Sequence, residues 1–147
     1  MTITTRLAAE ADLPALLALF RELHPDDPVP SAQAAADAWQ AIRRQPGRAV
    51  LLAESGSVVA GTIDCTTLPN VTRGARPFML VENVVVAAEH RRSGVGAALV
   101  AAAVAMARQA RCYKVQLLSR SSREAAHAFY ESRGFRAVAQ GYRLYLD

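Results

Sequence analysis

The chain has 147 residues, of which 52% are hydrophobic and 20% are charged, and its formal net charge is +4 at pH 7. This length and composition predict one globular domain over residues 1–147 and exclude a disordered chain. The basic residues are scattered and form no long block, which favours a small polyanionic ligand over a nucleic-acid groove.

The two cysteines and the apolar segments indicate the cellular compartment and whether a metal site is expected. Cys65 and Cys112 lie far apart and lack the spacing of a metal site, so two reduced, buried thiols are favoured over a disulfide. No metal site is predicted. The longest apolar run, residues 97–107, is too short to span a bilayer, and no secretory signal is visible. The sequence therefore predicts a cytoplasmic protein without a membrane partner.

The first half of the chain predicts a strand, two helices and a hairpin. Residues 1–7 resemble an edge strand, and Asp12 is expected to cap the helix that follows. Three prolines within residues 24–30 predict a loop, after which Ser31 opens a second helix. Strands are expected over residues 49–54 and 58–67, joined across Ser55–Ser57.

The second half predicts alternating strands and helices. A polar loop over residues 68–77 leads into a strand over 78–86, a helix that runs to about Arg111, and a strand over 113–117. Ser121 and Glu124 form a capping box for a last helix that ends at Gly134. Residues 135–139 and 142–146 predict a closing antiparallel hairpin. The order β-α-α-β-β-β-α-β-α-β-β implies an α/β (α+β) fold, a mixed sheet with helices on both faces.

The stretch from Val81 to Val100 carries the clearest chemical signal. It is a buried strand, a short basic turn, Gly94 and Gly96, and then a long apolar helix. The first N–H groups of a helix lack intrahelical partners, and glycines remove the side chains that would keep a phosphate away from the backbone. No Lys-Ser or Lys-Thr pair follows, which excludes a P-loop, and Leu99 stands where a dinucleotide fingerprint needs a small residue.

Two motifs here resemble those of the GNAT superfamily of N-acyltransferases. Arg91-x-x-Gly94-x-Gly96 is similar to its acyl-CoA pyrophosphate loop, and residues 129–135, Phe-Tyr-Glu-Ser-Arg-Gly-Phe, are similar to its second signature. The order of predicted elements agrees over the whole length. The resemblance implies a mixed, mostly antiparallel twisted sheet and an acetyl-CoA-dependent N-acetyltransferase (EC 2.3.1 class). Such an enzyme transfers the acetyl group by direct attack of a primary amine, most simply of a small molecule, on the thioester.

The resemblance also assigns residues to the cofactor. The backbone of the strand before the turn pairs with the pantetheine, and the turn holds the pyrophosphate. Many members carry an Asn at the start of the last helix, whereas this chain has Arg123, so that contact is replaced or missing. The residues expected to bind acetyl-CoA are Val84, Val85, Val86, Arg91, Arg92, Ser93, Gly94, Val95, Gly96, Ala97, Arg123 and Tyr130.

Two side chains are the candidate catalytic groups. Glu82 interrupts an apolar strand, where a buried carboxylate has a raised pKa and suits a base acting directly or through water. A structural Glu beside a strand bulge is the alternative, and Asn83 either orients the amine or satisfies backbone groups there. Tyr130 matches the family's proton donor to the departing thiolate, the alternative being an amphipathic core aromatic.

Other assignments stay open at this stage. His127 shares a helix face with Tyr130, His90 lies in the basic turn, and His24 precedes Asp26 and Asp27 in a loop expected to cover the acceptor. A non-catalytic acyl-CoA sensor and an acetyltransferase of protein lysines or N-termini are the alternative functions. No nucleic-acid partner is predicted, and a homodimer is left open.

Overall fold

The structure, a computed structural model, describes residues 2–147, and the chain forms two compact units that divide after Gln116. Met1, which the sequence assigned to the first strand, lies outside the described residues. The elements are β1 Ile3–Leu7, η1 Glu10–Asp12, α1 Leu13–Leu23, α2 Ala32–Arg44, β2 Arg48–Ser55, β3 Val58–Leu68, α3 Thr72–Ala75, β4 Phe78–Val86, η2 Ala88–His90, α4 Val95–Gln109, β5 Val115–Leu117 and α5 Glu124–Ser132.

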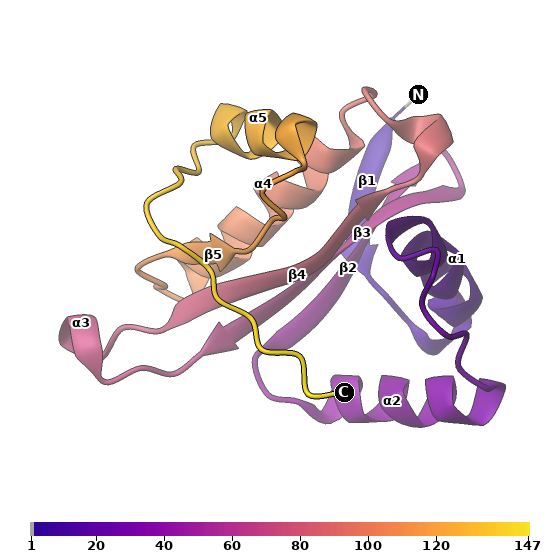
Figure 1. Cartoon of the computed structure of the whole chain (residues 1–147), viewed down its shortest axis with the longest axis horizontal. Helices are drawn as coiled ribbons and strands as arrows, with labels where there is room; N and C mark the ends of the chain where they lie inside the picture. The colour runs from indigo at the N-terminus through magenta and orange to yellow at the C-terminus, as the bar shows by residue number, and fades with distance from the viewer. Residues whose placement is uncertain (1) are drawn as a thin grey trace. The chain divides into compact units, whose positions relative to one another are not determined.

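The sheet has five strands in the order β1-β2-β3-β4-β5, and the pairs from β1 to β4 are antiparallel (Figure 1). The predicted class, a mixed α/β fold with a mostly antiparallel sheet, is confirmed. The bounds predicted for β4 are reproduced, and the β2–β3 hairpin turns at Gly56 as expected. No helix within residues 2–147 is long and apolar enough to cross a membrane.

Helices cover both faces of the sheet. Leu52 packs with Leu16 of α1 and Trp39 of α2 in one buried cluster. Leu52 pairs with Thr62, so Gly61, the next residue along β3, points to the opposite face. There a Cβ atom on Gly61 would meet Val95 and other side chains of α4. The core therefore consists of two layers, with α1 and α2 on one face of the sheet and α4 on the other (Figure 1).

One extra residue in β4 interrupts its pairing with β3. Thr62 pairs with Val85 and Asp64 with Glu82, so a step of two residues on β3 is matched by three on β4. Asn83 takes up the extra length with a φ of 52°, a left-handed conformation that Asn tolerates better than most residues. This β-bulge lies in the strand that leads to the glycine turn.

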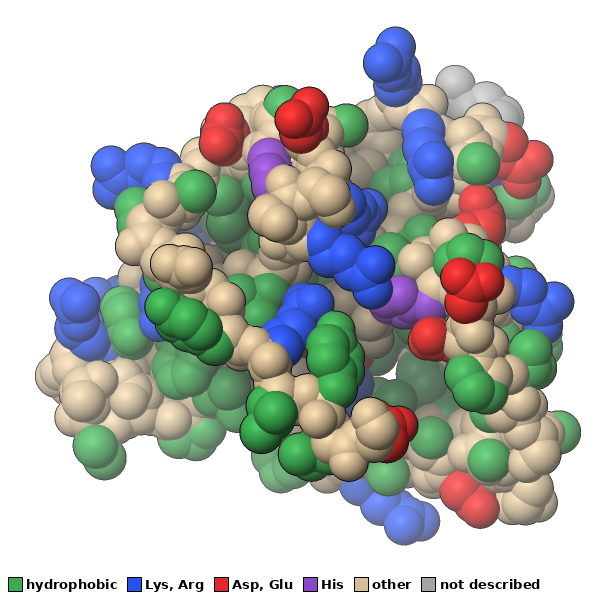
Figure 2. Space-filling model, viewed as in Figure 1, with side chains coloured by type: hydrophobic (Ala, Val, Ile, Leu, Met, Phe, Trp, Pro, Cys, Tyr) green, Lys and Arg blue, Asp and Glu red, His purple; other side chains and the backbone are tan. Residues whose placement is uncertain are grey.

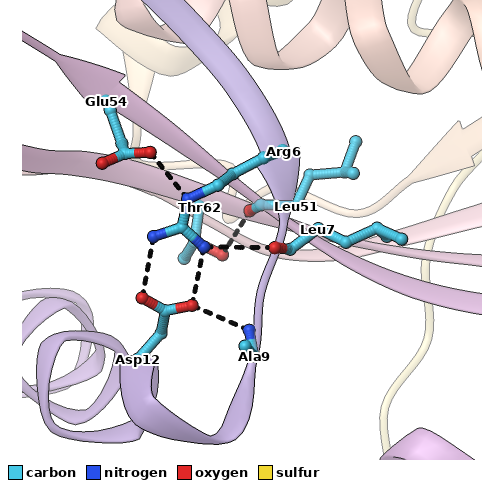
Figure 3. Close-up of polar contacts among 7 residues, drawn as sticks. All are labelled: Arg6, Leu7, Ala9, Asp12, Leu51, Glu54 and Thr62. Atoms are coloured by element: carbon cyan, nitrogen blue, oxygen red, sulfur yellow. Dashed lines mark hydrogen bonds and ion pairs between the residues drawn. The ribbon is translucent and has the colours of Figure 1, made fainter.

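An ion-pair cluster ties β1 to the start of α1 and to β2 (Figure 3). The Arg6 guanidinium donates to both carboxylate oxygens of Asp12, at 2.7 and 2.8 Å, and its Nε donates to Glu54 at 2.6 Å. Asp12 also accepts from the N–H of Ala9. Asp12 is the N-cap residue of α1, as predicted, but its carboxylate is engaged by these donors and makes no cap hydrogen bond. The predicted cap at Ser31 is confirmed: its hydroxyl accepts from the N–H of Ala34.

The C-terminal unit, Leu117–Asp147, differs most from the prediction. Its helix α5 has Arg123 at the N-cap without a side-chain cap hydrogen bond, so the predicted capping box at Ser121 is wrong. His127 explains this, because its Nε2 lies 2.7 Å from the carbonyl oxygen of Arg120 and holds residues 120–123 in a turn. Gly134, with φ 93°, follows the helix as predicted.

The predicted closing hairpin is also wrong, because residues 135–139 and 142–146 form no strand. The only backbone hydrogen bonds that the N–H groups of residues 135–147 donate are from Phe135 to Tyr130 and from Val138 to Arg136. An isolated hairpin is marginal in water unless a further strand or helix supports it. This unit contains no further strand along which the segment pairs.

Acid should weaken the Arg6–Asp12–Glu54 cluster. The Arg6 hydrogen bond lowers the pKa of Asp12 from 3.8 to about 2, so the cluster's contribution to stability is present above pH 4 and is lost as the pH falls toward 2. Asp12→Asn should lower the free energy of unfolding at pH 7 and show a smaller loss between pH 4 and 2 than the wild type. Urea denaturation at pH 7, 4 and 2 tests this, with Asp37→Asn on the surface of α2 as the control. If Asp12→Asn and the wild type lost the same unfolding free energy on acidification, Asp12 would not be the group responsible.

Candidate active site

The glycine turn presents backbone N–H groups at the start of α4. Gly94 is the N-cap, with a left-handed φ of 89° and no side-chain cap hydrogen bond. The first backbone bond of the helix is from Ala98 to the carbonyl of Gly94, at 3.0 Å, so the N–H groups of Val95, Gly96 and Ala97 precede the helical ladder. Together with the helix dipole these donors make a site for a phosphate. Residues 91–94 are exposed, which leaves the turn open to a ligand.

The turn is held in place by side chains on both sides. Arg91 Nε donates to the carbonyl oxygen of Val86 at 3.3 Å, and the Ser93 hydroxyl donates to the carbonyl of His90. Glu22 of α1 accepts from the N–H of Ala88 at 2.9 Å. Nothing in the sequence marks Glu22, because its position in the pattern of α1 is that of any exposed glutamate on a helix. Arg91 and Ser93, expected to bind the ligand, therefore also shape the turn.

Gly61 lets α4 approach the sheet. A Cβ atom at this position would lie 2.9 Å from the carbonyl oxygen of Val85 and 2.9 Å from Cγ1 of Val95, closer than real Cβ contacts. Val95 is the first residue of α4, so the absence of a side chain at Gly61 sets how near the phosphate turn lies to β4. Sequence analysis did not single out Gly61, although a glycine inside an apolar strand is a signal of close backbone approach.

Glu82 lies on the bulge and is exposed. The prediction of a buried carboxylate is wrong, because the bulge breaks the alternation of β4 and turns both Glu82 and Asn83 toward solvent, between the buried Val81 and Val85. The alternative, that Glu82 is a structural residue beside a strand bulge, is confirmed in one respect: Glu82 does lie beside a bulge. An exposed carboxylate can bind a cationic amine or hold a water molecule, so the candidate base remains.

A buried ion pair lies across the strand from Glu82. Asp64 of β3 is opposite Glu82 in the register, on the α1–α2 face, and is 5% exposed. Arg48 donates to both of its carboxylate oxygens, at 3.0 and 2.6 Å, and this raises the pKa of Arg48. The guanidinium neutralises Asp64, which relieves the repulsion that two carboxylates in direct cross-strand positions would otherwise have. Sequence analysis missed this pair.

The end of β4 is expected to expose backbone groups. β5 has three residues whereas β4 has nine, so β5 can pair with only part of it. Just before β5, the carbonyl of Lys114 accepts from the N–H of Met79, near the start of β4, at 3.0 Å. Val84, Val85 and Val86 lie at the other end, where Arg91 already occupies one carbonyl, that of Val86. The predicted role of these three residues in holding a ligand stays a prediction.

Tyr130 and Arg123 belong to the C-terminal unit. Tyr130 is partly buried between Phe129 and Phe135, with ring centroids 5.3 and 5.8 Å away. Burial raises the pKa of its phenol above 10, and the charge of Arg123 opposes this only in part. The phenol therefore keeps its proton at neutral pH. Arg123 is exposed at the N-cap of α5.

The remaining candidates are less specific. A hollow of about 490 Å³ is lined by Arg48, Thr67 and the last residues of α4. These residues are at the opposite end of α4 from Gly94, so the hollow is separate from the phosphate turn. Cys65 and Cys112 are free thiols, as predicted, but only Cys65 is fully buried, and burial raises its pKa to about 12. A thiol with that pKa is no nucleophile at neutral pH.

Comparison with known proteins agrees with this geometry. The model of the acetyltransferase (GNAT) family matches residues 14–135, which include the bulge, the glycine turn and Tyr130. The chain belongs to the GNAT acetyltransferase family. It is 33% identical over 141 residues to a glucosamine 6-phosphate N-acetyltransferase of Trypanosoma brucei brucei, covering 95% of this chain and 92% of the relative. This GNAT protein is thus an N-acetyltransferase.

Solved structures support the same assignment. A putative acetyltransferase from Agrobacterium tumefaciens superimposes with a TM-score of 0.93 at 38% identity, covering 97% of this chain and 99% of the other. An aminoglycoside N-acetyltransferase in complex with CoA superimposes with a TM-score of 0.83 at 18% identity, covering 99% and 95%. The second likeness shows the fold alone.

Gly61→Ala tests how the GNAT chain positions its phosphate turn. The added methyl group meets the Val85 carbonyl and Val95, so we expect a loss of about 1–3 kcal/mol in the free energy of unfolding, typical of overpacking. Denaturant titration of the variant and the wild type measures this loss. A Gly61→Ala protein as stable as the wild type would show that the approach is not tight.

Proposed function

We propose that the chain, acting as one domain over residues 1–147, transfers the acetyl group of acetyl-CoA directly to a primary amine of a small molecule. Acetyl-CoA would supply the activated thioester and a pyrophosphate for the turn at Gly94. The N–H groups of this turn suit a pyrophosphate, because backbone N–H groups at a helix start, without a capping side chain, bind phosphate oxygens well. Membership of the GNAT acetyltransferase family supports the same cosubstrate.

The observation that carries the proposal is the continuity of β4 with the phosphate turn. Glu82 lies at the bulge and Val86 four residues later, a distance of about 13 Å along an extended strand. The glycine turn follows after η2. An elongated ligand with its phosphates on α4 would therefore extend along the end of β4 toward the exposed carboxylate.

Glu82 is proposed as the base for the attacking amine. Its carboxylate is solvent-exposed, so it would accept the ammonium proton directly or through a bound water molecule. The neutralised Arg48–Asp64 pair leaves Glu82 as the uncompensated negative charge at this point of the sheet. That charge would also attract a cationic amine before the reaction.

Tyr130 is proposed as the proton donor to the departing sulfur. Its phenol is protonated throughout the neutral range because burial raises its pKa. A protonated hydroxyl is what a leaving thiolate requires. Arg123 is proposed to take part in binding the cosubstrate in place of the usual Asn.

The acceptor class is inferred from a relative of this chain. The relative that is 33% identical is a glucosamine 6-phosphate N-acetyltransferase, whose substrate is an amino sugar. We propose an amino sugar as the first acceptor class to test. The exposed Glu82, with Asp26 and Asp27 in the loop after α1, favours a positively charged amine.

A turnover assay with acetyl-CoA and thiol detection tests the function. The acceptors are glucosamine, glucosamine 6-phosphate, neamine and a lysine peptide. Amine-dependent thiol release with an amino sugar is expected. Turnover with the peptide alone would favour a protein acetyltransferase, and acetyl-CoA binding without turnover on any acceptor would favour a sensor.

Glu82→Gln keeps the shape of the side chain and removes its basicity. We expect turnover to fall by about a hundredfold, because the amide cannot accept the proton of the ammonium group. Steady-state rates at saturating acetyl-CoA measure this, with Glu10→Gln on η1 as the control. Near-normal turnover of Glu82→Gln would return Glu82 to a structural role.

Tyr130→Phe removes one oxygen and keeps the ring between Phe129 and Phe135. A core role predicts a stability change of about 1 kcal/mol and normal turnover. The proton-donor role predicts unchanged acetyl-CoA affinity and lower turnover, with a smaller loss for a donor whose thiol is more acidic. Because burial raises the pKa of Tyr130 from its ordinary value, its deprotonation should cause no fall in the wild-type rate in the neutral range. Tyr113→Phe is the control. Wild-type turnover of the Tyr130→Phe protein with both acyl donors would exclude the proton-donor role of Tyr130.

A further inference from the structure

Four basic side chains come together where the loop between β3 and β4 meets the segment that leads from α4 to β5. The loop carries Arg73 and Arg76, and the segment carries Arg111 and Lys114. The two lie side by side, because Arg76 donates to the carbonyl oxygens of Arg111 and Cys112, at 3.2 and 3.1 Å. All four basic residues are exposed, and Figure 2 shows Lys and Arg side chains beside the place where Figure 1 draws α3. We call these four residues the basic patch.

The basic patch has no acidic counterpart in its own surroundings. No Asp or Glu occurs in residues 65–81 or in residues 90–123. Within residues 2–147 none of the four side chains forms an ion pair. Basic residues that are scattered in the sequence are thus gathered by the fold on one surface, where no carboxylate of this chain pairs with them.

Two of these cations are held on aromatic rings. The Arg73 guanidinium lies 5.3 Å from the centroid of the Tyr113 ring. Lys114 Nζ lies 5.4 Å from the same centroid and 5.1 Å from that of the Phe78 ring. The shared ring brings two like charges together, and their repulsion is relieved when an anion binds next to them. Side chains that are already oriented also lose less conformational entropy on binding.

The loop that presents Arg73 has an uncommon backbone. Arg73, Gly74 and Ala75 have successive φ angles of 54°, 69° and 61°, and only the middle residue is a glycine. Such left-handed conformations persist where their surroundings hold them, and they gather at functional sites. Here the side-chain amide of Asn70 donates to the hydroxyl oxygen of Thr72 at 2.8 Å, at the start of the turn. The loop therefore holds Arg73 in a defined position.

The end of α4 accounts for only part of the basic patch. Carbonyl groups at the end of a helix attract cations, and Arg76 donates to two carbonyls that follow α4. Arg73 and Lys114 make no hydrogen bond to a backbone carbonyl and lie on the rings. The 15 residues of α4 place its last turn about 22 Å from Gly94. The pyrophosphate of the cosubstrate therefore does not explain the basic patch.

We propose that the basic patch is a docking surface for an acidic peptide segment of a partner protein. Guanidinium groups pair with carboxylates through two parallel hydrogen bonds. Val71, two residues before Arg73, is 92% exposed and offers an apolar contact next to the charges. A single-stranded nucleic acid fits less well, because its bases stack on open aromatic faces, whereas Phe78 and Tyr113 already carry cations.

Fluorescence anisotropy of the full-length chain with a labelled peptide tests the docking surface. The peptide has four glutamates around one leucine, and the control peptide has a glutamine in place of each glutamate. Only the acidic peptide should bind, more weakly as salt is added, and saturating acetyl-CoA should not displace it. Equal binding of the two peptides, no binding, displacement by acetyl-CoA, or tighter binding of a thymidine oligonucleotide would overturn the proposal.

Charge reversal locates the binding surface. Arg73→Glu and Lys114→Glu should each weaken the affinity for the acidic peptide by about tenfold or more, because an attraction becomes a repulsion. Arg43→Glu, at an exposed position on α2, changes the net charge by the same amount and should leave the affinity nearly unchanged. A loss as large in Arg43→Glu would mean that the peptide responds to net charge alone, and the docking surface would be refuted.

A titration of the wild type followed by nuclear magnetic resonance needs no variant. The acidic peptide should shift the amide signals of residues 71–76 and 111–116 and leave those of residues 91–97, in the phosphate turn, in place. Shifts centred on any other part of the chain would contradict the assignment of this surface.

Discussion

The pairing of β3 with β4 is the constraint on which the rest of this site depends. One extra residue in β4, taken up by Asn83 with a left-handed backbone, interrupts the regular ladder. The interruption exposes Glu82 while Val81 and Val85 stay buried. β4 leads through η2 to the turn that starts α4. The exposed carboxylate and the candidate phosphate turn therefore lie along one continuous stretch of backbone.

Much of the fold could be predicted from the sequence because local signals agree with tertiary packing. The apolar run of β4 and the two glycines at the start of α4 have one reasonable structural interpretation, and the helix cap at Ser31 needs only residues three apart. The capping box at Ser121 failed because His127 bonds the carbonyl of Arg120 and favours a turn. The closing hairpin failed because alternating residues specify a strand only when a neighbouring strand is available.

The glycine motif of the candidate site is visible in the sequence, whereas the exposure of its side chains is not. Exposure depends on strand register, which a single bulge changes. Glu82 therefore looked buried in a regular strand and is exposed in the folded one. The supporting residues Glu22 and Asp64 act across elements far apart in the sequence, so no local pattern marks them.

Calorimetric titration of Gly96→Val with acetyl-CoA tests the central claim most directly. Gly96 belongs to the first turn of α4, and its N–H precedes the helical ladder. If the pyrophosphate binds to this backbone, a branched side chain there should weaken the affinity by about tenfold or more, the equivalent of about 1.4 kcal/mol, while circular dichroism shows a folded protein. A folded Gly96→Val protein that binds acetyl-CoA as tightly as the wild type would contradict the account.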